Sequence, residues 1–222
     1  MNPIQENRYA TIYFDFDGTL QDTLAVDLMV INAVYDEVRA RYGCPVTPVD
    51  EATLRRWLGH RPADFWHEFL PGVPEAVKQE ANERIGERMR TAIAAGNFLF
   101  PGAETILQTL WERGIHIVIL SNCYRAYADA VTARYDLTRF IDDFLCAEDY
   151  DWMPKHRILA ADLPRRTGPF LMVGDRFGDM EAGHKNGVDT AFCTYGTGAP
   201  SEGAGAKYLL GDIGSLLHCT VK

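Results

Sequence analysis

Two aspartates two residues apart, Asp15 and Asp17, are the first residues in this 222-residue chain whose types and spacing suggest chemistry. They follow residues 10–14, a β-branched and aromatic run that predicts a buried strand. Because side chains two apart on a strand share a face, the two carboxylates begin on the same side, with Phe16 opposite. Gly18 then lets the backbone turn sharply. The sequence therefore predicts two anionic groups at the carboxyl end of a strand, where open α/β sheets bind ligands.

Two carboxylates this close repel each other, so they need a cation, a shared proton, or both. With Mg²⁺ between them, one can remain an ionised nucleophile while the other exchanges protons. Asp and Gly are also common in solvated turns, and Asp-Gly alone favours that interpretation. The position of the whole run 13–20 on an apolar strand favours the catalytic one.

Two further groups of polar residues lie at a predicted strand end and a predicted helix start. Ser121 and Asn122 follow the apolar strand 115–120, where they could hold phosphoryl oxygens or cap the next helix. Lys155 begins a helix, a mildly unfavourable place for a cation because of the helix dipole. That cost suggests a role in countering the charge of a phosphoryl group, although a solvated lysine is the commoner explanation of any single lysine.

Another acidic pair follows the apolar strand 169–174. Asp175 lies at the tip of this strand, where its oxygens could bind a hard cation. Asp179 could complete the acidic cluster, orient a metal-bound water, or simply cap the following helix.

The pattern of apolar residues divides the chain into two kinds of segment. Between residues 22 and 97 it predicts helices and no convincing strand. The expected helices cover residues 23–42, 47–58, 62–69 and 74–95. These are too many for one crossover connection, so residues 22–97 are interpreted as an inserted all-α domain.

From residue 99 onward, strands and helices alternate. The expected strands cover residues 115–120, 144–147, 169–174, 189–193 and 208–210, and the Gly- and Pro-rich residues 195–205 are expected to form a loop. Alternation of this kind predicts a doubly wound parallel sheet of the α/β class. The predicted core domain therefore comprises residues 1–21 and 98–222.

Composition limits the classes of partner. A net charge of −9 disfavours nucleic acid and anionic membranes, but a locally positive site could still bind a phosphorylated metabolite. The polar N-terminus lacks the apolar region of a signal peptide, and the apolar run 114–120 is too short to span a bilayer. The five cysteines show no paired short spacing, which predicts reduced thiols in a cytoplasmic protein.

The segment Asp15-Phe16-Asp17-Gly18-Thr19 resembles the first motif of the haloacid dehalogenase-like hydrolases, in the phosphoglycolate phosphatase-like subfamily. The segment Gly174-Asp175-Arg176-Phe177-Gly178-Asp179 is similar to the fourth motif. Ser121 and Lys155 stand in the order of the second and third, although the family often follows its lysine with proline and this chain has His156. Arg157 is the alternative to Lys155. The resemblance covers essentially the whole chain and implies a Rossmann-like core with an inserted helical cap.

The resemblance also implies roles for individual residues. Asp15 would be the nucleophile that forms an aspartyl-phosphate, and Asp17 the acid and then the base. Mg²⁺ would be held by Asp15, the backbone carbonyl of Asp17 and Asp175, with Asp179 in or beside this set. The residues expected to bind the phosphoryl group or the rest of the substrate are Gly18, Thr19, Ser121, Asn122 and Lys155, together with His60 and Arg61 in the cap. The last two are about equally well explained as solvated loop residues.

The leading hypothesis is a Mg²⁺-dependent phosphatase of a small phosphorylated metabolite, such as phosphoglycolate or a sugar phosphate. Asp17 favours phosphate esters, because relatives that attack carbon or cleave phosphonates lack an acid at that position. A phosphomutase of the β-phosphoglucomutase type is the alternative, and a non-catalytic binding protein is a third possibility. The protein is expected to be a cytoplasmic monomer or homodimer without nucleic acid or membrane partners.

Overall fold

The computed structural model describes residues 6–58 and 62–222. The chain divides into two compact units, one formed by Met1–Asp22 with Leu99–Lys222 and the other by Thr23–Phe98. The boundaries expected from the sequence, after residues 21 and 97, each lie one residue from these limits.

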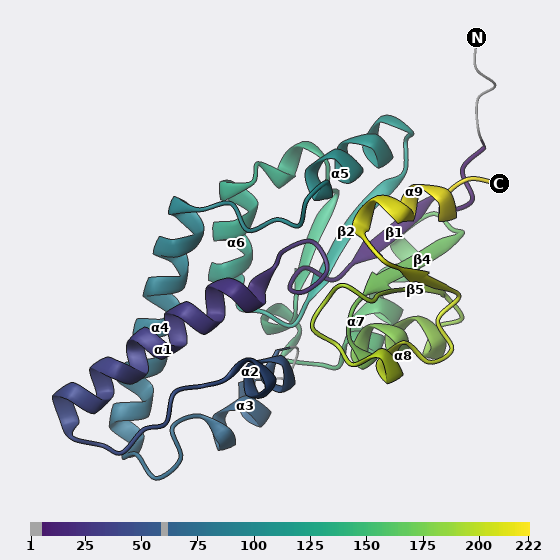
Figure 1. Ribbon diagram of the computed structural model, residues 1–222. Coiled ribbons are helices and arrows are strands. Elements are labelled where there is room, and N and C mark those ends of the chain that lie inside the picture. Colours follow the sequence, from purple (N-terminus) through teal and green to yellow (C-terminus); the bar gives the residue numbers. More distant parts are fainter. Residues whose placement is uncertain (1–5, 59–61) are drawn as a thin grey trace. The chain divides into compact units, whose positions relative to one another are not determined.

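The first unit is built on a six-stranded parallel sheet with the strand order β3-β2-β1-β4-β5-β6 (Figure 1). Its strands are β1 (Thr11–Phe14), β2 (His116–Ser121), β3 (Asp143–Cys146), β4 (Phe170–Gly174), β5 (Asp189–Cys193) and β6 (Tyr208–Leu210). Its helices are α5 (Ala103–Glu112), α6 (Arg125–Arg134), α7 (Lys155–Asp162), α8 (Phe177–Lys185) and α9 (Leu216–Cys219). The predicted doubly wound α/β class is confirmed.

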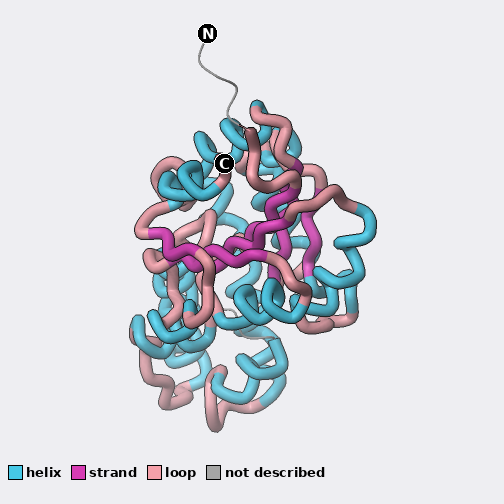
Figure 2. Tube along the Cα trace, turned by 90° about the vertical axis from the view of Figure 1, so that its right-hand side faces the viewer, coloured by secondary structure: helices cyan, strands magenta, loops and turns pink. Residues whose placement is uncertain are grey.

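Helices cover both faces of this sheet, as a parallel sheet requires. Every side chain of β1 is buried, and Tyr13 packs with Val118 and Met172 of the neighbouring strands against Ile158 of α7 and Ala182 of α8. Helices α5 and α6 lie on the opposite side of the sheet (Figure 1), so the strands form the central layer of this unit (Figure 2).

The strand order reverses direction at β1. The chain runs from β1 to β2 and β3 on one side, and then crosses to β4 on the other side of β1. Phe14, the last residue of β1, is in register with Ile119 and Val173. The residues that follow β1 and β4 therefore meet at the carboxyl edge of the sheet, at the point where the strand order reverses.

The described helices of the second unit are α1 (Thr23–Tyr42), α2 (Glu51–Trp57), α3 (Pro62–Glu68) and α4 (Glu75–Ala95), joined by loops, and no strand occurs among its described residues. Its buried cluster joins Val34 and Tyr35 of α1 to Leu54 and Phe69. The rings of Tyr35 and Phe69 lie 5.8 Å apart, within the range of aromatic pairs that stabilise cores. Among the described residues, no helix combines the length and the apolar character needed to cross a bilayer.

The predicted start of a helix at residue 47 is wrong, because α2 begins at Glu51. The side chain of Asn32 accepts a hydrogen bond from the amide of Val49 at 2.7 Å and donates one to its carbonyl at 2.9 Å. Asp50 then accepts from the amide of Thr53 at 2.7 Å and caps α2. A side chain of α1 thus holds the backbone of Val49 outside the helix.

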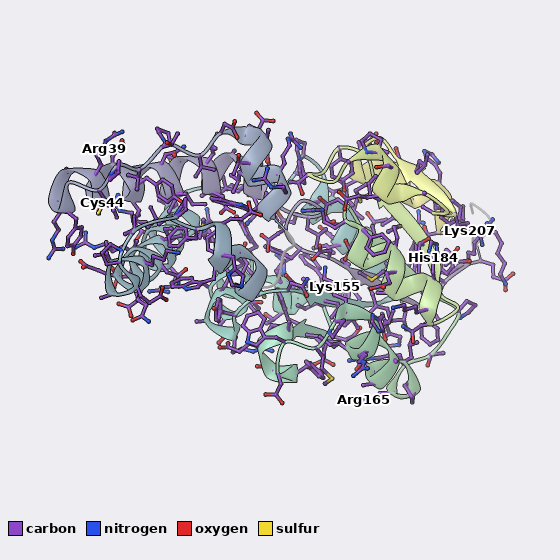
Figure 3. All side chains as sticks on the ribbon, turned by 90° about the horizontal axis from the view of Figure 1, so that it is seen from below. Arg39, Cys44, Lys155, Arg165, His184 and Lys207 are labelled. Atoms are coloured by element: carbon purple, nitrogen blue, oxygen red, sulfur yellow. The ribbon has the colours of Figure 1, made fainter. Side chains whose placement is uncertain are left out.

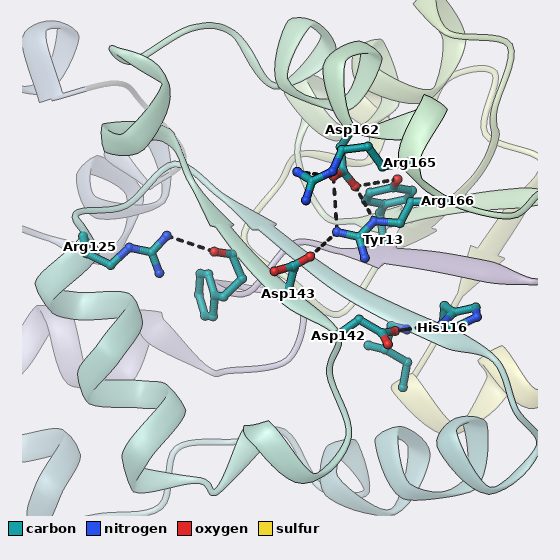
Figure 4. Close-up of polar contacts among 10 residues, drawn as sticks. Tyr13, His116, Arg125, Asp142, Asp143, Asp162, Arg165 and Arg166 are labelled. Carbon is teal, nitrogen blue, oxygen red and sulfur yellow. Dashed lines mark hydrogen bonds and ion pairs between the residues drawn. The ribbon is translucent and has the colours of Figure 1, made fainter.

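A buried charge network fixes α7 to the sheet (Figure 4). Asp162, at the end of α7, accepts hydrogen bonds from the Tyr13 hydroxyl and the Arg166 Nε, both at 2.9 Å. Arg166 also pairs with Asp143 of β3. Arg165 approaches Asp162 from solvent, at 3.7 Å and with 68% of its side chain exposed. Because α7 begins with Lys155, this network also sets where that lysine lies.

Replacement of Arg166 by methionine should lower the free energy of unfolding by about 3 kcal/mol, because it leaves the buried carboxylate of Asp162 without its main cation. Arg165→Met is the matched control, since it removes the same charge from the solvent side and should change stability by less than about 1 kcal/mol. Urea unfolding of both variants measures the difference. Equal losses would contradict the role assigned to burial.

Candidate active site

Three buried aspartates converge at the carboxyl edge of the sheet. Asp15 directly follows β1, Asp175 directly follows β4, and Asp179 lies in the first turn of α8. One carboxylate oxygen from each lies within 4.8 Å of the others, and all three residues are buried. The parallel strand order explains why residues so far apart in sequence meet here.

Lys155 lies between two of these carboxylates. Its Nζ is 2.8 Å from Asp15 Oδ1 and 2.6 Å from Asp179 Oδ1, and 5% of its side chain is exposed. Figure 3 labels it at the start of the α7 ribbon. Arg157, the alternative considered from the sequence, is exposed. The crossover from β3 to β4 begins at the same edge of the sheet as the acidic cluster, so Lys155, the first residue of α7, can reach the aspartates.

The electrostatics of the cluster reflect burial and mutual repulsion. Burial, together with the carboxylates of Asp179 and Asp175, raises the pKa of Asp15 well above its usual value, although Lys155 opposes the shift. Burial and Asp179 likewise raise the pKa of Asp175 to about 6. Burial alone would lower the pKa of Lys155, but Asp15 and Asp179 more than offset it, so the net shift is upward and the lysine stays charged.

Asp175 is oriented by two threonines. Its Oδ2 accepts hydrogen bonds from the amide and the hydroxyl of Thr197, at 2.7 and 2.8 Å, and its Oδ1 accepts one from the Thr19 hydroxyl at 3.2 Å. Thr197 was not predicted as a site residue from the sequence, which indicated only a loop there. The available signal was its position between Gly196 and Gly198, because a Cβ at either glycine would collide with Asp175.

Gly18 and Thr19 shape the turn beneath this cluster. Gly18 has a φ of +79°, and a Cβ there would collide with the carboxylate of Asp175. Glycine is therefore required both by the backbone conformation and by the close approach. The Thr19 hydroxyl is directed at Asp175, and the expected contacts of Gly18 and Thr19 with substrate stay predictions.

Asp17 lies in different surroundings from Asp15. It is partly exposed, and its Oδ1 accepts a hydrogen bond from the hydroxyl of Tyr127 at 2.6 Å and one from Gln21 Nε2 at 3.4 Å. Within the described chain, its carboxylate is not part of the three-aspartate cluster. Tyr127 and Gln21 carry no motif signature and were not predicted. Metal binding by the backbone carbonyl of Asp17 stays a prediction.

Ser121 is the last residue of β2 and is buried, and Asn122 follows it. The alternative interpretation of these two residues as helix caps is wrong, because the residue that precedes α6 is Tyr124. The amide of Arg125, the first residue of α6, instead donates to Glu148 Oε2 at 2.7 Å. Because β2 runs parallel to β1 and ends at Ser121, this residue stands at the same sheet edge as Asp15.

Asp179 combines two of the roles considered for it. Its Oδ2 accepts a hydrogen bond from the amide of Arg176 at 3.0 Å, which caps α8, while its Oδ1 pairs with Lys155. His60 and Arg61, the predicted contacts in the cap, lie outside the described residues.

The donor set of the cluster fits a hard divalent cation. Among the described residues, Lys155 pairs with Asp15 and Asp179, so one positive charge faces three carboxylates whose ionised forms carry three negative charges. Asp15 Oδ1 accepts from Lys155 and from the amide of Phe16, whereas its Oδ2 has no partner among the described residues. Clustered carboxylate oxygens with excess negative charge are what Mg²⁺ binds.

The chain is similar in sequence or in fold to several known proteins. A phosphoglycolate phosphatase from Haemophilus influenzae is 24% identical over 205 residues, covering 85% of this chain and 87% of the relative. A 5′-nucleotidase from Pseudomonas aeruginosa is 25% identical over 206 residues, covering 88% and 87%. The crystal structure of CbbY from Rhodobacter sphaeroides in complex with phosphate aligns with a TM-score of 0.74 at 19% identity, covering 93% of this chain and 96% of that one.

The family model of the haloacid dehalogenase-like hydrolases matches residues 9–187, which is well over half of the chain. The family expected from the two aspartate motifs is thereby confirmed, and with it the expectation that the protein is an enzyme. The chain belongs to the haloacid dehalogenase-like hydrolases.

Proposed function

We propose that this hydrolase is a Mg²⁺-dependent phosphatase that cleaves monoesters of a small phosphorylated metabolite through an aspartyl-phosphate on Asp15. One observation carries the proposal. Asp15 lies buried at the end of β1 with one oxygen paired to Lys155, while the other has no partner among the described residues. A carboxylate held in this way is suited to covalent catalysis.

The reaction takes place in two displacements. In the first, a carboxylate oxygen of Asp15 forms a bond to phosphorus, the bond from phosphorus to the ester oxygen breaks, and Asp17 protonates the departing alkoxide. In the second, Asp17 takes a proton from water as the water oxygen attacks phosphorus. Inorganic phosphate leaves, and the carboxylate of Asp15 is regenerated.

Asp15, Asp175, Asp179 and the backbone carbonyl of Asp17 are the groups that would hold Mg²⁺, and the ion would neutralise charge between the nucleophile and the phosphoryl group. Lys155 keeps its positive charge, because its carboxylate neighbours raise its pKa, and it can therefore attract phosphoryl oxygens. Ser121, buried at the end of β2, supplies a hydroxyl donor at the same sheet edge.

The substrate class follows from the second aspartate and from the relatives. An alkyl ester has a poor leaving group, so its cleavage needs an acid such as Asp17. The relatives named phosphoglycolate phosphatase and 5′-nucleotidase bear the names of phosphate ester hydrolases, which supports this class. We infer that the helical unit Thr23–Phe98 acts as a cap and selects the leaving group, and phosphoglycolate is the first ester to test.

Phosphate release from a panel of small phosphate esters should require both Mg²⁺ and Asp15. The variant Asp15→Asn should lose activity by at least about a thousandfold, since the amide is a far weaker nucleophile, and a chelator should abolish wild-type turnover. Asp129→Asn, an exposed change on α6, should retain wild-type activity. A folded wild-type protein that releases phosphate from no ester would contradict the proposal. An isomerised ester as product would indicate a phosphomutase instead.

Gly198→Ala should weaken Mg²⁺ binding by at least about tenfold, because the new Cβ collides with the backbone of Asp175 and disturbs the hydrogen bonds from Thr197. The Mg²⁺-dependent rise in melting temperature measures binding independently of turnover. Gly178→Ala is the matched control, because no atom lies within 4 Å of its added Cβ. Unchanged Mg²⁺ binding in Gly198→Ala would show that the loop does not set the position of Asp175.

A further inference from the structure

Tyr127, which lies outside the four motifs, donates a hydrogen bond to Asp17. The hydroxyl of Tyr127, on α6, lies 2.6 Å from Asp17 Oδ1. That length is typical of a hydroxyl that donates to a carboxylate. Asp17 and Tyr127 are 110 residues apart, so the contact depends on the fold rather than on local sequence.

The direction of this hydrogen bond is set by a chain of neighbours. Tyr135 donates its hydroxyl hydrogen to Gln21 Oε1 at 3.1 Å, which turns the amide nitrogen of Gln21 toward Tyr127. Gln21 Nε2 then donates to the Tyr127 oxygen at 2.7 Å. Because the amide nitrogen of Gln21 can only donate and the carboxylate oxygen of Asp17 can accept, the hydrogen of Tyr127 is directed to Asp17. Gln21 is fully buried, so its amide has little freedom to reorient.

Packing fixes the same residues in place. The turn that carries Asp17 is closed by two backbone hydrogen bonds, from the Gly18 amide to the Gln21 carbonyl at 2.8 Å and from the Gln21 amide to the Phe16 carbonyl at 3.0 Å. The buried ring of Phe16 meets the ring of Tyr127 edge-on, with centroids 6.3 Å apart. The tyrosine therefore presents its hydroxyl from a fixed ring.

We propose that Tyr127 is a positioning residue for Asp17 in the reaction, with Gln21 and Tyr135 fixing the tyrosine. This role rests on the proposed phosphatase function. Tyr127 donates a hydrogen bond to Oδ1 and transfers no proton of its own. Tyr127 and Gln21 both donate to Oδ1, so they hold the carboxylate of Asp17 in one orientation. A group held in one geometry for proton transfer loses rate when its support is removed.

The test compares two leaving groups in wild type and Tyr127→Phe, which removes the hydroxyl and keeps the ring on Phe16. The substrates are p-nitrophenyl phosphate, whose phenolate leaves without an acid, and the alkyl phosphate of the panel that the wild type cleaves fastest. The value of kcat/KM covers the steps up to departure of the leaving group. It should fall about tenfold for the alkyl ester and less than twofold for p-nitrophenyl phosphate.

A double-mutant cycle shows whether the effect acts through Asp17. In an Asp17→Asn background, assayed with excess enzyme, Tyr127→Phe should cause no further selective loss. Tyr124→Phe is the matched control, because Tyr124 precedes the same helix, is 47% exposed, and its hydroxyl makes no hydrogen bond among the described residues. It should match wild type on both esters.

The outcomes are distinguishable. A selective loss that disappears in the Asp17→Asn background supports the positioning role. No loss, a gain, an equal loss on both esters, or a loss that persists in that background overturns it, even if the wild type is an active phosphatase. A wild-type protein that cleaves neither ester contradicts the proposed function itself, and the role of Tyr127 with it.

Discussion

The ion pairs from Lys155 to Asp15 and Asp179 are the interaction on which the three-aspartate cluster depends. Three carboxylates buried within 4.8 Å of one another repel strongly, and burial makes that repulsion costly. The raised pKa values of Asp15 and Asp175 express this cost. One ammonium compensates for only one of the charges. Replacing such a cluster with apolar residues is often neutral or stabilising, so its presence is better explained by chemistry than by stability.

The same turn gives its two aspartates different surroundings. Asp15 ends buried among carboxylates with a lysine beside it, whereas Asp17 is partly exposed and hydrogen-bonded to Tyr127 and Gln21. In the proposed reaction this difference in environment would let Asp15 serve as nucleophile and Asp17 as acid. The division is produced by α6 and α7, which deliver a tyrosine to one aspartate and a lysine to the other. A single strand and its turn could not create it.

The sequence predicted the elements that follow from hydrophobic periodicity and the site residues that lie at strand ends. β5 and β6 were predicted to the residue, Asp15 and Asp175 were each expected at the end of a strand, and the family resemblance assigned both to one Mg²⁺ site. The patterns missed Thr197, Tyr127 and the start of α2. Each of these depends on a side chain that contacts a segment distant in the sequence, as Asn32 contacts Val49. Local periodicity carries no information about such contacts. Such contacts become visible only in the folded chain.

The residues proposed to carry the chemistry all lie in one of the two units, and the groups that select the substrate need not lie there. The aspartate cluster, Lys155 and the chain from Tyr135 to Asp17 all belong to the unit formed by Met1–Asp22 and Leu99–Lys222. In the proposed reaction these residues act on the phosphoryl group and on the oxygen that leaves it, which every phosphate monoester shares. Esters differ from one another beyond that oxygen. The groups that distinguish one substrate from another must therefore lie outside the catalytic cluster, and the helical unit Thr23–Phe98 is where their search should begin.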